Sequence, residues 1–148
     1  MRMTLHTDYA LRMLIYVATR PGGICTANDV AEAYGLSRNH LLKVAQTLRD
    51  LGVVETARGR TGGIRLAKAP SAIAIGALVR ATEEEFCLAE CMQAGGRPCA
   101  ISPACRLKGV LHEALSAFLA VLDKYTLEDI VRNRAALGPL LGIDAVAA

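Results

Sequence analysis

The chain has 148 residues, 53% hydrophobic and 21% charged, which suits one hydrophobic core with an appended segment and excludes a disordered chain. Its apolar runs fall short of the roughly 18 residues of a membrane span, and its first residues lack a signal-peptide pattern, so we expect a cytoplasmic protein. Residues 1–70 carry ten Lys and Arg against five Asp and Glu, whereas residues 71–148 carry seven against nine. A basic N-terminal half is compatible with nucleic-acid binding but is also common on solvated surfaces.

Two helices are predicted at the start of the chain. Thr7 can cap a first helix that continues to about Thr19, with apolar residues at helical spacing, before Pro21-Gly22-Gly23 ends it. Thr26 and Asp29 match the pattern of a capping box. The short helix that they open stops at Gly35, a residue suited to a helix C-terminus.

A third helix and a hairpin follow. Ser37 can cap the helix, and Gly52 ends it. Residues 53–56 and 64–66 have the alternation of strands, and the loop between them is rich in glycine and arginine, which predicts a hairpin with a basic tip. The residues expected to face inward from the third helix are Leu41, Leu42, Val44, Ala45 and Leu48.

This order of elements is that of a winged helix-turn-helix, in which the third helix enters the major groove of DNA and the hairpin approaches the backbone or minor groove. Arginine can pair with guanine and asparagine with adenine, so polar residues early in the third helix suit base reading. An ordinary solvated helix face remains an open alternative for each residue. A phosphate-binding loop is disfavoured because the sequence has no GxxxxGK[ST] pattern. The candidate DNA-binding residues are Ser37, Arg38, Asn39, His40 and Lys43 in the helix and Arg58, Gly59, Arg60 and Arg65 in the hairpin.

The C-terminal half is predicted to hold a short helix over 75–81, an irregular loop over 86–102, a long helix from Ser102-Pro103 to about Tyr125, and another short helix from Thr126. The long helix carries a heptad-spaced apolar seam with a second apolar strip beside it. One strip is enough for packing within a subunit, so the second predicts a homodimer, and a single wide buried face is the alternative. The seam comprises Leu107, Leu111, Ala114, Phe118, Val121 and Tyr125, and the strip comprises Leu115, Leu119 and Leu122.

The predicted fold class is therefore mainly α with a small β-hairpin. We expect a winged helix-turn-helix domain over 1–81, a cysteine-containing loop over 82–105, and a dimerisation helix with a C-terminal tail over 106–148.

Five cysteines occur, at positions 25, 87, 91, 99 and 105, and four of them fall within 19 residues. In a reducing cytosol such clustering favours metal or redox chemistry over structural disulfides. The last three have the spacing C-x7-C-x5-C, and thiolates suit either zinc or an iron-sulfur cluster, so the spacing leaves the metal open. Cys105 is expected in the first turn of the long helix, where the helix dipole favours its thiolate. Cys25 stands apart and is expected to be buried as a small apolar residue.

Four segments carry a resemblance to a known family: TDYALR at 7–12, SRNHLLKV at 37–44, GRTGGIRL at 59–66 and ISPACRLK at 101–108. With the order of elements, they make residues 1–133 resemble the Rrf2 family of winged-helix transcription regulators, in particular its nitric-oxide-sensing repressors. The resemblance implies a homodimer that binds double-stranded operator DNA and carries an iron-sulfur cluster, either 2Fe-2S or 4Fe-4S.

The resemblance also implies the cluster ligands. Cys91, Cys99 and Cys105 match the three cysteines that hold the cluster in the family, and Asp8 matches the carboxylate that is the fourth ligand in the nitric-oxide-sensing branch. Another branch uses a histidine shortly after the last cysteine, and this chain has none there. On sequence grounds alone Asp8 would be an ordinary acid at a helix start. Cys87 is an additional cysteine that could replace Asp8 or be buried, and we favour burial.

We therefore predict a transcriptional repressor, not an enzyme, that senses nitric oxide through its cluster. A regulator of the same family that responds to iron or another redox signal is the first alternative. A zinc-structured module or an electron-transfer protein is the second, and neither would need a basic hairpin. His6 and His112 receive no role.

Overall fold

The computed structural model describes residues 2–57, 62–93, 95–97 and 99–143. Its regular structure consists of helices and one two-stranded antiparallel hairpin, which confirms the predicted fold class. The helices are α1 (Leu5–Thr19), α2 (Ala27–Tyr34), α3 (Arg38–Asp50), α4 (Ile75–Thr82), α5 (Arg106–Leu122), α6 (Leu127–Ile130) and α7 (Arg134–Leu140), and the strands are β1 (Val54–Ala57) and β2 (Gly63–Leu66). Short 3-10 turns cover Pro70–Ala72, Glu90–Met92 and Ser102–Ala104.

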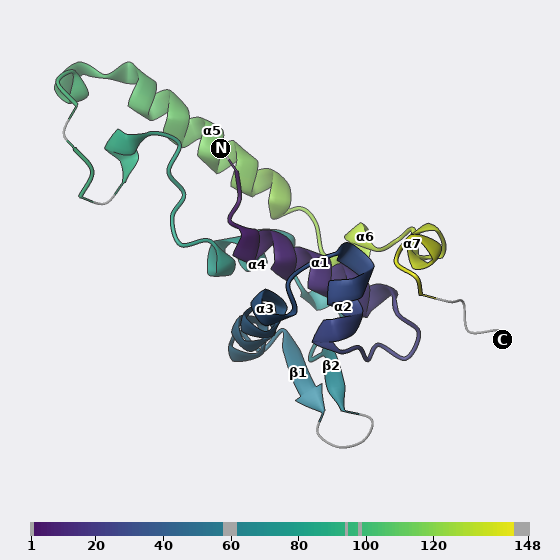
Figure 1. Ribbon diagram of the computed structural model, residues 1–148. Helices are drawn as coiled ribbons and strands as arrows, with labels where there is room; N and C mark the ends of the chain where they lie inside the picture. Colours follow the sequence, from purple (N-terminus) through teal and green to yellow (C-terminus); the bar gives the residue numbers. More distant parts are fainter. Residues whose placement is uncertain (1, 58–61, 94, 98, 144–148) are drawn as a thin grey trace.

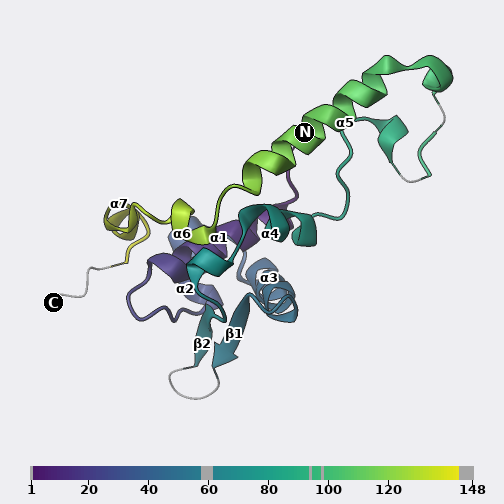
Figure 2. The same cartoon turned by 180° about the vertical axis from the view of Figure 1, so that it is seen from behind.

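The molecule has two parts. Figure 1 shows α1 to α4, α6, α7 and the hairpin gathered around a common core, with α5 and the cysteine-containing loop reaching away from it. The view from behind in Figure 2 gives the same separation. The loop turns back at the far end of α5, so this end of the loop lies far from the hairpin.

Helix α1 runs through the core, where Met13, Leu14 and Val17 are buried. Its cap is Thr4, whose hydroxyl accepts a hydrogen bond from the Thr7 backbone N–H at 3.2 Å. The prediction of Thr7 as the cap is wrong, because Thr7 is a fully buried residue inside the first turn. The helix begins a few residues earlier because Thr4 offers the same hydroxyl acceptor as Thr7.

The second and third helices begin and end as predicted. Thr26 and Asp29 form a reciprocal capping box, and Gly35 ends α2 in the left-handed conformation with φ of 63°. The Ser37 side chain caps α3. The prediction that Leu42 faces inward is wrong, because its side chain is 44% exposed. A helix turns by about 100° per residue, which takes Leu42 off the stripe that its neighbours bury.

The hairpin joins the core through a third short segment. Cys25 N–H donates to the Ile64 carbonyl at 3.0 Å, and Ile64 N–H donates back at 2.6 Å. A Cβ at Gly63 would lie 2.7 Å from the Cys25 carbonyl oxygen, so only glycine permits this approach. The tip of the hairpin, residues 58–61, lies outside the described residues.

Helix α5 is anchored to the core at its C-terminal end. Arg80 on α4 donates to the two carboxylate oxygens of Asp123 at 2.5 and 2.7 Å, and Ile75 N–H donates to the Tyr125 carbonyl at 2.9 Å. The predicted long helix from Ser102 to Tyr125 is wrong at both ends, because residues 102–104 form a separate 3-10 turn and α5 ends at Leu122. Within the described residues, no helix is both long and apolar enough to cross a bilayer.

Candidate nucleic-acid interface and metal centre

Helix α3 presents a polar face to solvent. Arg38, Asn39 and Lys43 are all exposed. Helical spacing places Asn39 and Lys43 opposite the stripe that is buried in the core. None of the three forms an ion pair with another residue that the structure describes. Their donors are therefore available to an external partner.

Two other predicted residues of α3 are engaged within the protein. The Ser37 hydroxyl accepts from the His40 backbone N–H at 3.5 Å and so serves as the helix cap. The His40 side chain is half-buried, and its ring centroid lies 4.7 Å from that of Tyr9 on α1. This imidazole packs against α1, whereas the side chains of Asn39 and Lys43 are exposed.

The hairpin supplies one described basic residue. Arg65 on β2 faces Glu55 on β1, and its Nε donates to a Glu55 carboxylate oxygen at 2.7 Å. Both side chains are about half exposed, so the pair is a weak one that a phosphate could replace. The predicted residues Arg58, Gly59 and Arg60 lie outside the described part of the chain.

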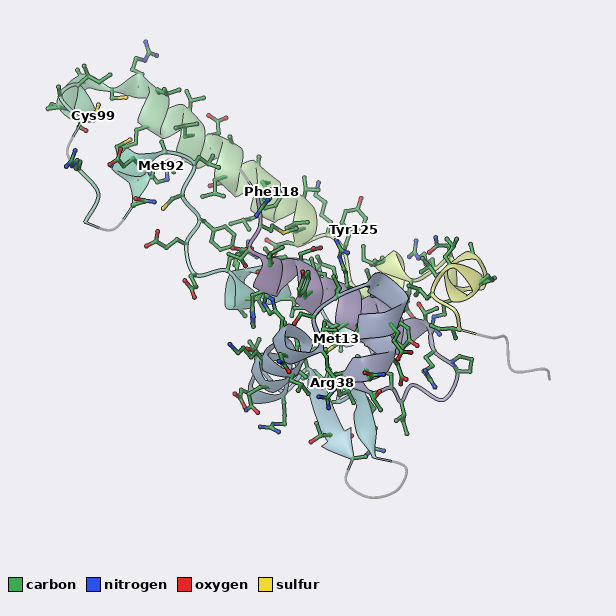
Figure 3. The ribbon with its side chains drawn as sticks, viewed as in Figure 1. Met13, Arg38, Met92, Cys99, Phe118 and Tyr125 are labelled. Atoms are coloured by element: carbon green, nitrogen blue, oxygen red, sulfur yellow. The ribbon has the colours of Figure 1, made fainter. Side chains whose placement is uncertain are left out.

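Three predicted metal ligands lie near the far end of α5. Cys91 is in the 3-10 turn Glu90–Met92, Cys99 is exposed in the loop that follows, and Cys105 is the residue directly before α5. All are free thiols. The prediction that Cys105 lies within the first helical turn is wrong: its ψ of 106° is extended, which makes it the N-cap position. Figure 3 shows Cys99 and Arg38 at opposite ends of the molecule.

Asp8, the predicted fourth ligand, is in the first turn of α1. Its carboxylate forms an ion pair with Arg12 one turn later, with an N–O distance of 2.8 Å. The Arg12 guanidinium in turn lies 5.7 Å from the centroid of the Tyr34 ring, within cation-π range. Among the described residues, no three Cys, His, Asp or Glu side chains are close enough to hold a metal, so this structure assembles neither the three cysteines nor Asp8 with them into one site.

The two remaining cysteines have different surroundings. Cys25 is buried, as predicted, and burial raises the pKa of its thiol to about 12, which makes it a poor metal ligand at neutral pH. Cys87 is half-buried, not buried as favoured from sequence. Desolvation and the nearby Glu85 carboxylate raise the pKa of the Cys87 thiol.

Some contacts of the site were not predicted. The spacing of four residues between Asp8 and Arg12 is a recognised ion-pair signal on a helix and could have indicated the pair. The contact of His40 with Tyr9 joins residues far apart in sequence, and nothing local indicates it.

Comparison with known proteins gives consistent results. Residues 3–133 match the Rrf2 family, whose description is "Iron-dependent Transcriptional regulator". The chain is 53% identical to the HTH-type transcriptional regulator NsrR of Bacillus subtilis, over 95% of this chain and 97% of the relative. It is 50% identical to NsrR of Bacillus licheniformis, over 95% and 99%.

A solved structure shares the fold. The global cysteine regulator CymR of B. subtilis is similar with a TM-score of 0.70 at 24% identity, covering 90% of this chain and 98% of that one. At this identity the likeness concerns the fold alone.

Proposed function

This chain belongs to the Rrf2 family of transcriptional regulators, and on that premise we propose that it is a dimeric repressor that binds operator DNA and releases it in response to nitric oxide through an iron-sulfur cluster on its cysteine loop. The observation that carries the proposal is that one chain holds both side chains suited to metal binding and side chains suited to DNA binding, in separate parts of the molecule. Free thiols lie in the loop that precedes α5, and an exposed polar helix face lies on the other side of the core.

The donor set of the loop suits an iron-sulfur cluster. Cys91, Cys99 and Cys105 are free and at least partly exposed, and thiolates are the usual ligands of such clusters. The same thiols could hold zinc, but the family description names iron. When bound, the cluster supplies iron atoms to which nitric oxide can bind.

A second copy of the chain is proposed to pack along α5. The apolar residues of this helix divide into two faces. One face is half-buried, and the other is exposed with heptad spacing. Within the half-buried face, Leu115 and Phe118 line a pocket together with Met3. The half-buried face comprises Leu111, Leu115, Phe118, Leu119 and Leu122, and the exposed face comprises Leu107, Val110, Ala114, Ala117, Val121 and Tyr125. A partner helix packed on the exposed face would bury the apolar side chains that remain exposed in a single chain.

Asp8 is proposed to complete the site in the other subunit. Helix α5 has 17 residues and so spans about 26 Å, which separates the cysteines from the core that holds α1. A carboxylate oxygen is a hard donor and is expected to be the most easily released of the four ligands. Arg12 is in place to pair with the Asp8 carboxylate, at an N–O distance of 2.8 Å, and would compete with the cluster for it. Loss of Asp8 from the cluster would free α1 from the neighbouring loop and would shift the population of dimer geometries away from the one that fits the operator.

Anaerobically purified protein provides the test. Its visible absorbance, iron and sulfide contents are measured for wild type and for Cys91→Ser, Cys99→Ser and Cys105→Ser, with Cys25→Ser as the matched control. The three ligand variants should lose the cluster, and the control should keep it. Iron and sulfide retained in all three would contradict the ligand assignment.

Nitric oxide titration tests the sensing step. Iron-nitrosyl absorbance and operator affinity are followed together, and both should change with the same stoichiometry. Asp8→Ala should keep iron on three cysteines but bind the operator weakly and respond little to nitric oxide, whereas Asp8→Cys should hold iron more firmly. A wild-type protein that forms nitrosyl species without losing operator affinity would overturn the proposal.

A separate experiment tests whether Asp8 completes the site of the other subunit. The mixed dimer has one Asp8→Ala subunit and one Cys99→Ser subunit. If Asp8 acts across the dimer, the cysteines of the first subunit meet the intact Asp8 of the second, so this site is complete. The other site then carries both substitutions. Such a dimer should retain one complete site. Two incomplete sites would mean that Asp8 serves its own chain.

A further inference from the structure

Two side chains that flank Asp8 connect the start of α1 to α3. His6 Nε2 lies 3.1 Å from the Thr47 hydroxyl oxygen. The Tyr9 ring packs on the His40 ring with centroids 4.7 Å apart and planes inclined by 59°. His40 is in the first turn of α3 and Thr47 is near its end, so the two contacts hold α3 at two points along its length.

The Thr47 hydroxyl has two neighbours within hydrogen-bond distance, His6 Nε2 at 3.1 Å and the Lys43 carbonyl oxygen at 3.3 Å. A hydroxyl can donate one hydrogen bond and accept others, so it can bond to both at once. The contact with His6 therefore joins α1 to α3 through this hydroxyl.

The second contact has the tilted geometry that aromatic pairs prefer. The His6 ring lies 6.2 Å from the His40 ring, so three rings from the two helices form one small cluster. The half-buried position of His40 is explained by this cluster. Its packing sets His40 apart from Asn39 and Lys43, which remain exposed.

The start of α1 is also tied to the segment that leads to the cysteine loop. Thr4 N–H donates to a Glu83 carboxylate oxygen at 2.8 Å, and the Thr4 hydroxyl donates to the same oxygen at 3.2 Å. Glu83 directly follows α4, at the beginning of the connection to the cysteines. The first turn of α1 therefore lies between the loop segment on one side and α3 on the other.

We propose that His6 and Tyr9 are positioning residues that pass the displacement of Asp8 to α3 through Thr47 and His40. The inference rests on the proposed function, since it requires that ligation of Asp8 changes operator affinity. The inference gives His6 a role. It also assigns His40 to the coupling between α1 and α3 and no longer to the reading of DNA bases. With the contacts intact, a shift of the first turn of α1 moves α3, and with them removed the shift is absorbed locally.

The test uses the cluster-loaded dimer and compares two operator dissociation constants, before and after nitric oxide. Their ratio is the coupling. Thr47→Val removes the hydroxyl and keeps the volume, with Thr47→Ser as the matched control. Tyr9→Leu removes the ring, with Tyr9→Phe as its control. Each disrupting variant should lower the ratio by about 2- to 30-fold while the cluster absorbance stays unchanged. Each control should keep the wild-type ratio.

The outcomes separate this inference from the function on which it rests. A merely structural role would weaken both dissociation constants by the same factor, and an unchanged ratio in Thr47→Val and Tyr9→Leu overturns the inference. If Tyr9→Leu does not fold, His6→Leu against His6→Gln, which keeps an N–H donor, makes the same comparison. A wild-type ratio of one would overturn the sensing proposal and this inference with it.

Discussion

Replacement of Gly76 by alanine should destabilise the protein, although alanine is normally the better helix former. Gly76 is a buried residue of α4 at the point where the end of α5 crosses it. A Cβ at this position would lie 2.9 Å from both the backbone nitrogen and the Cγ of Asp123, and closer still to Oδ1. The side chain of Asp123 could rotate, but its backbone nitrogen could move only with the end of α5.

The two opposing effects can be compared. Glycine to alanine inside a helix stabilises by about 0.5–1 kcal/mol through propensity. Overpacking against fixed neighbours costs about 1–3 kcal/mol. The Gly76→Ala variant should therefore lose about 1 kcal/mol of unfolding free energy, and at most about 2.5 kcal/mol. It should also disturb the bidentate contact between Arg80 and Asp123, which holds α5 to the core.

Gly109 is the matched control, because it lies in α5 and a Cβ there would meet no described atom within 4 Å beyond its own stretch of helix. Gly109→Ala should gain about 0.5–1 kcal/mol from propensity alone. Urea unfolding followed by circular dichroism, at one protein concentration because a dimer's stability depends on it, measures both variants. If Gly76→Ala gains as much stability as Gly109→Ala, the close approach of α4 and α5 does not constrain the fold as argued.

Three further outcomes are expected. Asn39→Ala should cost roughly 1–3 kcal/mol on the operator only, whereas Arg60→Ala should weaken operator and random DNA alike and lower the salt dependence by about one ion, as gel shifts at several salt concentrations would show. Val121→Asp, on the exposed face of α5, should shift the protein toward monomer in sedimentation, and an unchanged dimer would place the interface elsewhere. The hydrogen bond from Arg80 lowers the pKa of Asp123, so the stabilisation from this pair is complete above about pH 4 and is lost as the pH falls through the lowered pKa. Asp123→Asn should therefore differ most from wild type at neutral pH in unfolding free energy and converge with it in acid.

Local patterns were sufficient for part of the fold. The capping box at Thr26 and Asp29 and the end of α2 at Gly35 depend on residues within one turn, and both are confirmed. Thr4 and Thr7 offer the same hydroxyl as a cap for α1, and the choice between them depends on tertiary burial of Thr7. The position of Cys105 outside the helix depends on one backbone angle that no residue type dictates.

The remaining features depend on distant partners. The bond from His6 to Thr47 spans 41 residues and that from Thr4 to Glu83 spans 79, so neither has a local signal. Along α5, periodicity predicts two apolar strips but assigns some residues to the wrong strip. It assigns Leu111 and Phe118 to the same seam as Leu107, yet they are half-buried while Leu107 is exposed. The segment that covers each strip depends on the path of the loop. Helical periodicity carries no information about that path.

The two ends of α5 constrain how two copies could pair. Its N-terminal end follows Cys105 and carries the cysteine loop, whereas its C-terminal end is held to the core by Asp123 and Tyr125. In a parallel pair, the two loops would meet each other about 26 Å from either core, and Asp8 would reach neither. In an antiparallel pair, each loop would lie beside the core of the other copy, which holds Asp8 in the first turn of α1. A cluster that joined three cysteines of one chain to Asp8 of another would therefore require antiparallel packing along the exposed face of α5. The same arrangement would hold the two α3 helices at a fixed separation, as an operator with two half-sites requires.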